Sequence, residues 1–229
     1  MLISVLIPCF NEKKTIEEIV NRINDLKDLN LEIIIIDDNS NDGTKELLKD
    51  KIKDKVSKII FNNKNYGKGY CVKKGIQASN GDAILIQDAD LEYDPSDYPK
   101  LIKPIENGSA DVVYGSRFLG GEEKRVLYFW HSLGNKLLTI FSNMFTNLNL
   151  TDMEVGYKLF KSDILKDINL VENRFGIEPE VTAKISKKKI RIFEVGISYY
   201  GRKYEDGKKI TWRDGFSAIR CIIKYNLFD

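Results

Sequence analysis

Three acidic side chains at alternate positions follow a short apolar run in the first half of the chain. Residues 83–86 carry no polar side chain, which is typical of a strand buried on both faces. Asp88, Asp90 and Glu92 come directly after this run, and in an extended segment they point to the same side. Carboxylate oxygens suit Mg²⁺ or Mn²⁺, ions that also bind substrate phosphates. The spacing therefore predicts a divalent metal site, with a solvated acidic turn before Pro95 as the alternative interpretation.

Three further segments predict a sheet that positions these carboxylates. Apolar residues at 3–7 lead through a turn into residues with helical spacing, and the four isoleucines at 33–36 indicate a strand buried on both faces. At 67–69, Gly-Lys-Gly begins an apolar helix and allows the backbone to approach a ligand closely. Strands that alternate with helices form a mostly parallel sheet, in which ligands bind outside the carboxyl ends of the strands. Asp38 and Asp88 are therefore expected on the same rim.

The order and spacing of these motifs resemble the family 2 glycosyltransferases of the GT-A fold. The shared motifs are V-L-I-P-C-F-N-E, I-I-D-D-N-S-N-D-G-T, N-Y-G-K-G, D-A-D-L-E, Gly115-Ser116-Arg117 and a late arginine-containing loop. The resemblance covers nearly the whole chain and is strongest to enzymes that transfer sugars to dolichyl or polyprenyl phosphates. It implies a Rossmann-like α/β fold, a mostly parallel sheet flanked by helices, in a single domain of residues 1–229. The nucleotide-sugar half is expected at about 1–120 and the acceptor half at about 121–229.

The resemblance assigns the sugar donor and the metal mainly to the first half. It implies that the loop after the first strand contributes to the nucleoside pocket, and that Ile36 with Asp38 reads the base of a GDP- or UDP-linked sugar. Asp88 and Asp90 are expected to bind Mg²⁺ or Mn²⁺ directly. Glu92, where many relatives have Gln, binds it directly or through water. The expected donor-binding set is Pro8, Phe10, Glu12, Ile36, Asp38, Lys68, Asp88, Ala89, Asp90, Arg117, Arg202 and Lys208.

Two arginines are expected to stabilise the departing diphosphate. Arg117 follows a predicted strand and suits bidentate contact with a phosphate, the alternative being a surface pair with Asp111 or Glu122. Arg202 lies in a loop that resembles the R-x-x-G-x-S-K clamp of the family, although no serine precedes Lys208 here. The expected catalytic set is Asp88, Asp90, Arg117 and Arg202.

The implied reaction is an inverting single displacement by an acceptor oxygen at the anomeric carbon of a nucleotide-diphosphate sugar. The leading acceptor is a polyprenyl phosphate, which is largely dianionic at pH 7 and needs no general base. The alternative is a sugar or lipid hydroxyl, as in glycolipid or surface-polysaccharide assembly; it needs a base, for which Asp152, Glu154 and Glu178 are candidates. A nucleotidyltransferase is disfavoured because no G-G-x-G-T-R start is present, and a non-catalytic scaffold subunit because the acidic motif is intact.

The composition is that of an ordinary soluble protein, with 42% hydrophobic and 31% charged residues. The three cysteines show no C-x-x-C spacing, which indicates reduced packing residues in a cytoplasm. The single histidine, His131, excludes a histidine metal cluster. Neither a signal peptide nor a transmembrane helix is expected, because the start lacks a basic region and no uncharged stretch is long enough.

Charge and apolar spacing favour contact with an anionic membrane surface. The net charge is only +2, yet residues 184–224 hold twelve Lys/Arg against four Asp/Glu. No nucleic-acid-binding motif accompanies this charge, so anionic lipid and sugar nucleotide are better candidates than nucleic acid. Residues 126–145 are rich in apolar side chains. In 212–225, apolar residues recur at helical spacing beside Arg213, Arg220 and Lys224, which is the better fit to an interfacial helix; core packing is the alternative for both segments. We expect a cytoplasmic protein, peripheral at the membrane face, with a homo-oligomer or a small membrane partner as further options.

Overall fold

The structure is a computed structural model that describes residues 1–121, 125–126, 128–202 and 212–228, with only the backbone of residues 212 and 213. The strands are β1 (Leu2–Cys9), β2 (Asn30–Asp37), β3 (Lys58–Phe61), β4 (Ala83–Ile86), β5 (Val112–Ser116), β6 (Lys158–Lys161) and β7 (Ile192–Gly196). The helices are α1 (Ile16–Asn24), α2 (Thr44–Leu47), α3 (Lys68–Ala78), α4 (Tyr98–Glu106), α5 (Phe129–Thr146), α6 (Ser162–Lys166), α7 (Ile177–Ser186) and α8 (Trp212–Leu227). Short helical turns are η1 (Leu48–Ile52), η2 (Lys53–Lys55) and η3 (Pro95–Asp97).

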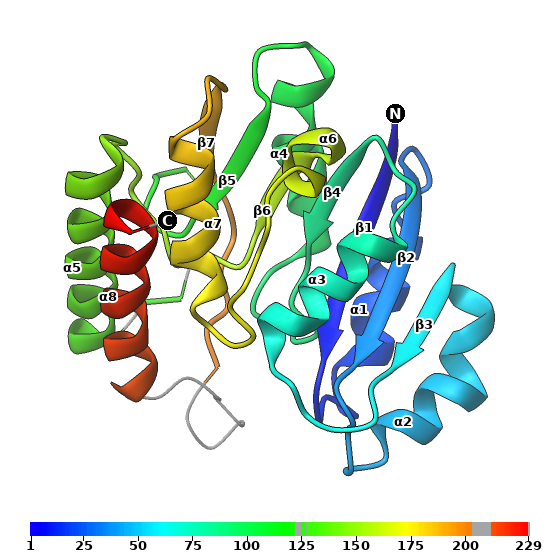
Figure 1. Cartoon of the computed structure of the whole chain (residues 1–229). Coiled ribbons are helices and arrows are strands. Elements are labelled where there is room, and N and C mark those ends of the chain that lie inside the picture. Colours follow the sequence, from blue (N-terminus) through cyan, green and yellow to red (C-terminus); the bar gives the residue numbers. More distant parts are fainter. Residues whose placement is uncertain (122–124, 127, 203–211, 229) are drawn as a thin grey trace.

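The described strands form one seven-stranded sheet in the order β3-β2-β1-β4-β6-β5-β7 (Figure 1). Neighbouring strands are parallel except around β6, which runs antiparallel between β4 and β5. The order changes direction at β1, because β2 and β3 lie on one side of it and β4 on the other. Such a switch point leaves a crevice at the carboxyl ends of the strands, where ligands bind. The predicted mostly parallel α/β sheet is confirmed, and the antiparallel β6 is an addition to it.

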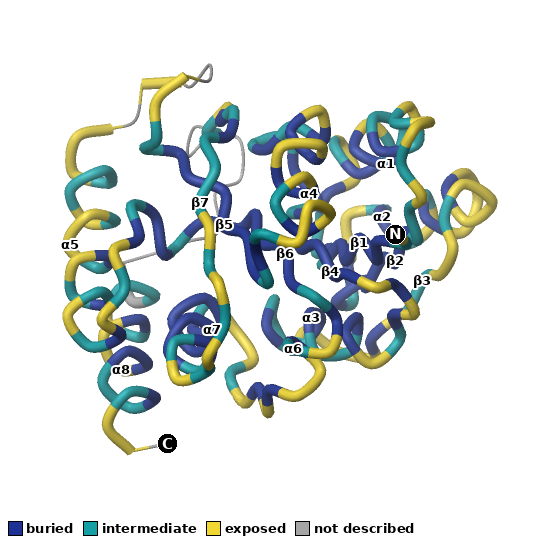
Figure 2. Tube along the Cα trace, turned by 90° about the horizontal axis from the view of Figure 1, so that it is seen from above, coloured by how far each residue is buried: buried dark blue, intermediate teal, exposed yellow. Residues whose placement is uncertain are grey.

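Helices cover both faces of the sheet. Figure 2 shows α1 and α4 on one face and α3, α6 and α7 on the other. Helix α3 lies close to the sheet because Gly75 has no side chain; a Cβ there would come within 2.9 Å of Leu6 and 3.0 Å of Ile36. Helices α5 and α8 lie side by side and pack on α7, beyond the β7 edge (Figure 1).

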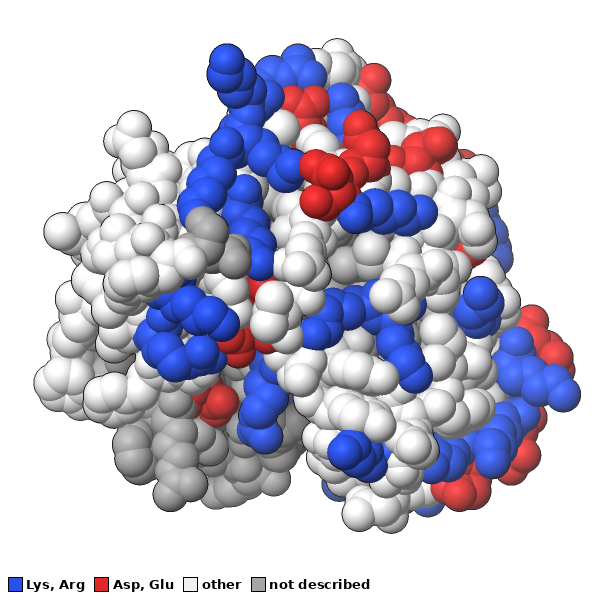
Figure 3. Space-filling view, in the orientation of Figure 1, with Lys and Arg blue, Asp and Glu red and all other residues white. Residues whose placement is uncertain are grey.

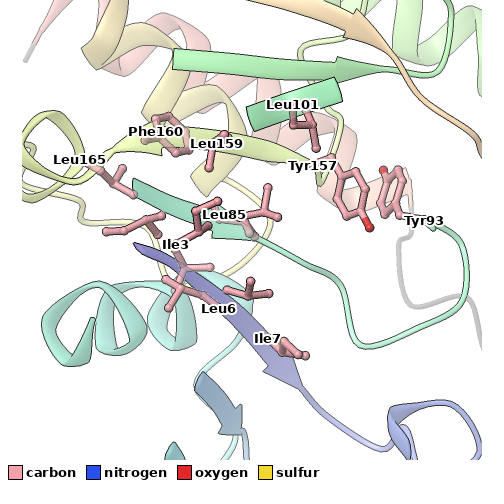
Figure 4. Packing of buried hydrophobic residues seen from close by; sticks show 14 of the residues in the cluster. Ile3, Leu6, Ile7, Leu85, Tyr93, Leu101, Tyr157, Leu159, Phe160 and Leu165 are labelled. Carbon is pink, nitrogen blue, oxygen red and sulfur yellow. The ribbon is translucent and has the colours of Figure 1, made fainter. Parts of the chain in front are cut away.

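The core is built from the apolar strands that the sequence predicts. The isoleucines at 33–36 and the residues of β4 are all buried. Figure 4 shows Leu6, Leu85 and Leu159 from β1, β4 and β6 among the packed side chains. Burying one such leucine stabilises the fold by about 1.5–3 kcal/mol relative to leaving it exposed. The three cysteines are buried free thiols, as expected for packing residues.

Helices α5 and α8 also carry exposed apolar stripes, defined here as Trp130, Leu137, Ile140 and Met144 on α5 and Phe216 and Ile219 on α8. Trp130 and Met144 are 75% and 74% exposed, and the surface over α5 shows almost no charged side chains (Figure 3). The opposite side of α8 is buried at Cys221, Ile222 and Tyr225, so core packing and surface exposure apply to different faces of this helix. None of the helices within the described ranges combines the length and hydropathy needed to span a membrane.

Candidate active site

A cavity of about 800 Å³ lies at the carboxyl ends of β1 and β4, at the switch point of the sheet. Its walls come from the loops after these strands, from the N-terminal ends of α3 and α7, and from α5 and α8. The predicted site residues that line it are Pro8, Phe10, Glu12, Asp38, Lys68, Asp88, Ala89, Asp90, Glu92, Arg117 and Arg202. Ile36 is fully buried and packs towards α3, so its side chain is not brought to the cavity. Lys208 lies outside the described residues.

The acidic loop is a turn, not the extended segment that the alternate spacing predicts. Strand β4 ends at Ile86, and the backbone N–H of Glu92 donates to Oδ1 of Asp90 at 3.0 Å. Aspartate commonly closes a turn in this way, which competes with strand extension. The loop begins at Gln87, a buried residue whose side-chain oxygen accepts hydrogen bonds from two core tyrosines. Asp88, Asp90 and Glu92 nevertheless all line the cavity, so the predicted grouping is present with a different backbone.

The carboxylates of the acidic loop are compensated by cations of the chain itself. Lys68 Nζ lies 2.7 Å from Oδ1 of Asp88, and Nη2 of Arg202 lies 2.6 Å from Oδ2 of Asp90. The backbone N–H of Arg202 also donates to Glu92 at 2.7 Å. Across the part of the chain that the structure describes, no group of three or more His, Cys, Asp or Glu is arranged to hold a metal ion by itself.

The electrostatics of the loop nevertheless fit a divalent cation. Burial, together with the charges of Asp88 and Glu92, raises the pKa of Asp90 to about 7. Burial alone would lower the pKa of Lys68, but Asp88 and Glu178 raise it, so this amine stays charged. Mg²⁺ is commonly held by one or two carboxylates, with substrate phosphates supplying further oxygens. Asp88 and Asp90 meet that requirement without a complete protein cage.

Arg117 is buried in an ion pair that its sequence context did not predict. Its Nε and Nη2 donate to the two carboxylate oxygens of Asp152, each at 2.7 Å, and its exposed fraction is 8%. Its guanidinium carbon lies 5.3 Å from the ring centre of Tyr199. The alternative surface pair with Asp111 is wrong, because Asp111 instead binds Arg191, and Glu122, the other partner considered, lies outside the described residues. Asp152 is fully buried with both oxygens occupied, which removes it from the candidate general bases.

Asp38 holds the glycine-rich loop next to the cavity. Its oxygens accept hydrogen bonds from the backbone N–H groups of Tyr66 at 3.0 Å and Gly67 at 2.7 Å. A Cβ on Gly67 or Gly69 would come within 2.5 Å of a backbone carbonyl oxygen of residues 172–173. The two glycines therefore leave room for the backbone of residues 172–173, and not for a ligand as the sequence predicts. Base recognition by Asp38 stays a prediction.

Several cavity residues carry no recognisable signal in the sequence. Tyr93 is one: its hydroxyl accepts the backbone N–H of Gly156 at 3.0 Å, and its ring stacks on Tyr157 with 4.6 Å between centres (Figure 4). Gly156 itself lies against the carboxylate of Asp88, at a place where any Cβ would collide with it. The only sequence feature of this contact is the glycine in the segment 152–158. Why a glycine is required there becomes clear only from the structure.

Comparison with known families gives one match over most of the chain. Residues 4–168 match the family model described as Glycosyl transferase family 2. The dolichol-phosphate mannosyltransferase of Pyrococcus furiosus is 31% identical over 98% of this chain and 63% of its own length. The undecaprenyl-phosphate 4-deoxy-4-formamido-L-arabinose transferase of Aeromonas hydrophila is 27% identical over 85% of this chain and 59% of its own. The chain thus spans about three fifths of the length of these two relatives.

A solved structure shares the fold. Glucosyl-3-phosphoglycerate synthase from Mycobacterium tuberculosis, in complex with Mn²⁺, uridine diphosphate and phosphoglyceric acid, superimposes with a TM-score of 0.77. The superposition covers 99% of this chain and 79% of that one, at 17% sequence identity. At this identity the likeness concerns the arrangement of helices and strands.

Proposed function

The chain belongs to glycosyltransferase family 2, and we propose that it transfers a sugar from a nucleotide-diphosphate sugar to a polyprenyl phosphate such as dolichyl or undecaprenyl phosphate. The observation that carries the proposal is the cavity at the switch point, where carboxylates suited to a metal lie beside cations suited to phosphates. The names of two relatives, which transfer sugars to dolichol phosphate and undecaprenyl phosphate, support a lipid phosphate as the acceptor.

The donor is assigned to the half of the chain before about residue 120. Pro8 and Phe10 offer apolar surface to a nucleoside, and Asp38 lies beside them on the cavity wall. The structure with the same fold contains uridine diphosphate and Mn²⁺, which supports a nucleotide and a divalent metal here. A carboxylate accepts hydrogen bonds from uracil and from guanine, so both UDP- and GDP-linked sugars fit this assignment. Residues after about 120 supply the acceptor side, mainly through α5 and α8.

The metal would be held by Asp88 and Asp90, with Glu92 binding directly or through water. Mg²⁺ or Mn²⁺ at this place stabilises the negative charge that develops on the leaving diphosphate. Lys68 and Arg202, which neutralise these carboxylates in the structure, bind the diphosphate oxygens once another cation balances the acids. Arg117 stays fixed by Asp152 and contributes its positive field from the cavity wall.

We assign the chemical step as a single displacement with inversion. An oxygen of the acceptor phosphate attacks the anomeric carbon from the face opposite the diphosphate, and the bond to the diphosphate breaks with its electron pair on the leaving oxygen. A phosphate monoester has a second pKa of about 6 and is mostly dianionic at pH 7. No side chain therefore has to remove a proton from this acceptor.

The alternative acceptor, a sugar or lipid hydroxyl, is favoured by one observation. Burial, together with the charge of Glu178, raises the pKa of Glu154 to about 8, and Glu154 lines the cavity. A carboxylate with such a pKa is a competent general base near neutral pH. Glu154 is thus the base that a hydroxyl acceptor would use, in place of the occupied Asp152.

The same proposal includes peripheral contact with the cytoplasmic face of a membrane. The apolar stripes on α5 and α8 supply a surface that can enter the lipid headgroup region. The cationic flank expected from the sequence is weaker than predicted, because Arg220 lies 2.8 Å and Lys224 4.0 Å from Glu172. The side chain of Arg213 lies outside the described residues. Attachment is therefore assigned mainly to the apolar side chains.

A thermal-shift panel of UDP, GDP, dTDP and CMP with Mg²⁺ or Mn²⁺ tests the donor and the metal together. A ligand at one hundred times its Kd stabilises the folded state by about 2.7 kcal/mol. We expect UDP or GDP to raise the Tm by several degrees only when a metal is present, and CMP, which lacks the diphosphate, to do less. The Asp90→Asn variant should lose the metal-dependent part of the shift. No stabilisation by any nucleoside diphosphate at millimolar concentration would contradict the proposal.

A further inference from the structure

One wall of the cavity carries two glutamates that transfer to a phosphate does not use. Glu154 and Glu178 both line the cavity, and Glu178 is only 8% exposed. Oε1 of Glu154 and Oε2 of Glu178 are buried and have no hydrogen-bond partner among the described residues. Buried polar atoms in native proteins are nearly always paired, and leaving a buried acceptor without a donor costs stability. The two glutamates therefore mark a place where a ligand supplies hydrogen-bond donors.

Glu178 is linked through Lys68 to the carboxylate assigned to the metal, and Glu154 belongs to the segment that packs against that carboxylate. Lys68 Nζ lies between the two acids, 2.7 Å from Oδ1 of Asp88 and 3.0 Å from Oε1 of Glu178. Gly156 lies against the carboxylate of Asp88, and Glu154 is two residues before it in the chain. In a nucleotide-diphosphate sugar, the sugar is bonded to the terminal phosphate of the group that the metal binds. The glutamates thus border the space next to that phosphate.

The wall is held in place by buried contacts. Lys158 is 2% exposed, and its ammonium group donates to the backbone carbonyls of Met153 and Val155, on either side of Glu154. The hydroxyl of Tyr93 accepts the N–H of Gly156 at 3.0 Å. These contacts fix the peptide groups around Glu154 before any ligand binds, as a recognition site requires.

We propose that Glu154 and Glu178 form the subsite of the transferred sugar and accept hydrogen bonds from two of its hydroxyl groups. This inference rests on the proposed function, since it needs a sugar on the bound diphosphate. The carbonyl oxygen of a carboxyl group accepts hydrogen bonds from hydroxyl donors whether or not the group is ionised. A site built to bind a hydroxyl rejects an analogue without it, because its own polar groups then stay unpaired. The donor class is therefore a nucleotide-diphosphate hexose with free hydroxyls on the side that faces these two residues.

The test measures the affinity gained from the sugar, by calorimetry in the presence of Mg²⁺. UDP is compared with UDP-glucose and UDP-galactose, and GDP with GDP-mannose, on the wild type, Glu154→Ala and Glu178→Ala, which leave no side-chain acceptor. Glu106→Ala, at an exposed glutamate of α4, is the matched control. Losing one hydrogen bond weakens binding by roughly tenfold. We expect that loss for the sugar nucleotide, and a change below about twofold for the bare diphosphate.

Sugar nucleotides lacking one hydroxyl provide a second measurement on the wild type, which remains informative if Glu178→Ala fails to fold. Removing the hydroxyl that faces Glu154 should weaken wild-type binding and have no further effect in Glu154→Ala, because variant and analogue remove the same hydrogen bond. Equal losses for bare diphosphate and sugar nucleotide, or additive losses for variant and deoxygenation, would overturn the subsite while leaving the proposed function intact. A wild type that binds no nucleotide at all would overturn both.

Discussion

At the level of single residues, the carboxylates of the acidic loop pair with the two basic side chains that we assign to the diphosphate. In the structure Lys68 neutralises Asp88, and Arg202 neutralises Asp90. Both carboxylates still line the cavity. Metal and diphosphate are therefore expected to bind together, since the metal takes over the carboxylates and the diphosphate takes over the two cations. This coupling makes the acidic loop sensitive to any loss of carboxylate charge.

Replacing Asp88 or Asp90 by Asn should abolish transfer while the protein stays folded. The two carboxylates line a cavity wall, so on the proposed mechanism the change removes metal-assisted stabilisation of the leaving group without opening the core. We expect a loss of more than about a thousandfold in turnover, equivalent to several kcal/mol. Turnover is measured with Mg²⁺ and with Mn²⁺, and thermal unfolding serves as the control for folding. Near-normal turnover of both variants in excess EDTA would show that no metal acts here.

The two arginines should respond differently to replacement by lysine. Arg117 is buried and bidentate with Asp152, so Arg117→Lys should lower both turnover and Tm, because lysine cannot reproduce the planar fork. Arg202 lies at the cavity, and Arg202→Lys should reduce turnover with a smaller change in Tm. Breaking a buried ion pair commonly lowers the free energy of unfolding by about 3–5 kcal/mol, and we expect Arg117→Ala to lose no more than this. Equal thermal losses for the two lysine variants would contradict this division.

At the level of elements, one surface aspartate ties together three strands on the β7 side of the sheet. Asp111 precedes β5 and forms ion pairs with Lys161 at the end of β6 and with Arg191 just before β7. The hydrogen bonds from Arg191 and Lys161 hold the pKa of Asp111 well below its usual range. The carboxylate therefore stabilises the register of β5, which Arg117 follows, and of β6, which begins with Lys158.

Asp111→Asn should lower the free energy of unfolding at neutral pH and have less effect in acid. The pKa of Asp111 is lower in the folded protein than in the unfolded chain, where it is near 4. The ionised carboxylate therefore stabilises the folded state at pH values above about 4, and this contribution is lost as the pH falls towards the folded-state pKa. Chemical denaturation of wild type and variant between pH 3 and 7 measures the difference. Asp167→Asn, which removes an ion pair from a more exposed aspartate, is the control and should change little. A difference that does not shrink in acid would contradict the assignment.

Much of the sheet could be predicted from the sequence because its central strands have an unambiguous composition. The strands β1, β2 and β4 are apolar runs bounded by turn residues, and their carboxyl ends carry the predicted acids. Strand β6 was not predicted, since it has four residues and begins with the buried Lys158. Its position is set by pairing with β4 and β5, which is a tertiary preference rather than a local one.

The site could be predicted where one motif supplies neighbouring residues, and not where two distant segments meet. The three acids of residues 88–92 were predicted from their spacing and lie together. The pairing of Arg117 with Asp152 joins positions 35 residues apart, and no local pattern indicates it. Likewise, the place of Gly156 against Asp88 follows from packing between β4 and β6 and has no signature beyond the glycine itself.

At the level of the whole molecule, the helices that wall the cavity are also those with exposed apolar stripes. Trp130 both lines the cavity and is 75% exposed, and Ala218 of α8 lines the cavity on a helix that exposes Phe216. A membrane that contacts these stripes would therefore lie beside the cavity opening. This arrangement suits an acceptor whose phosphate must enter the site while its chain stays in lipid.

Flotation with liposomes should show weak attachment that depends on the apolar stripes. We expect the double variant Ile140→Ser with Met144→Ser to lose most flotation on phosphatidylglycerol vesicles, because it removes two exposed apolar side chains of α5. Salt should weaken attachment less than this variant does, since Arg220 and Lys224 already face Glu172. Val171→Ser, an exposed apolar residue outside α5 and α8, is the matched control. Unchanged flotation of the double variant would remove these stripes from membrane contact.

The most direct test of the central proposal is a transfer assay with two acceptors that differ only in their phosphate. The purified protein is incubated with Mg²⁺, a radiolabelled sugar nucleotide chosen from the thermal-shift panel, and either a polyprenyl phosphate or the polyprenol of the same chain length. We expect label in the lipid fraction as a sugar-phosphate-lipid with inverted anomeric configuration, none with the polyprenol, and none with Asp90→Asn. Label on the polyprenol or another hydroxyl acceptor, with none on the polyprenyl phosphate, would contradict it.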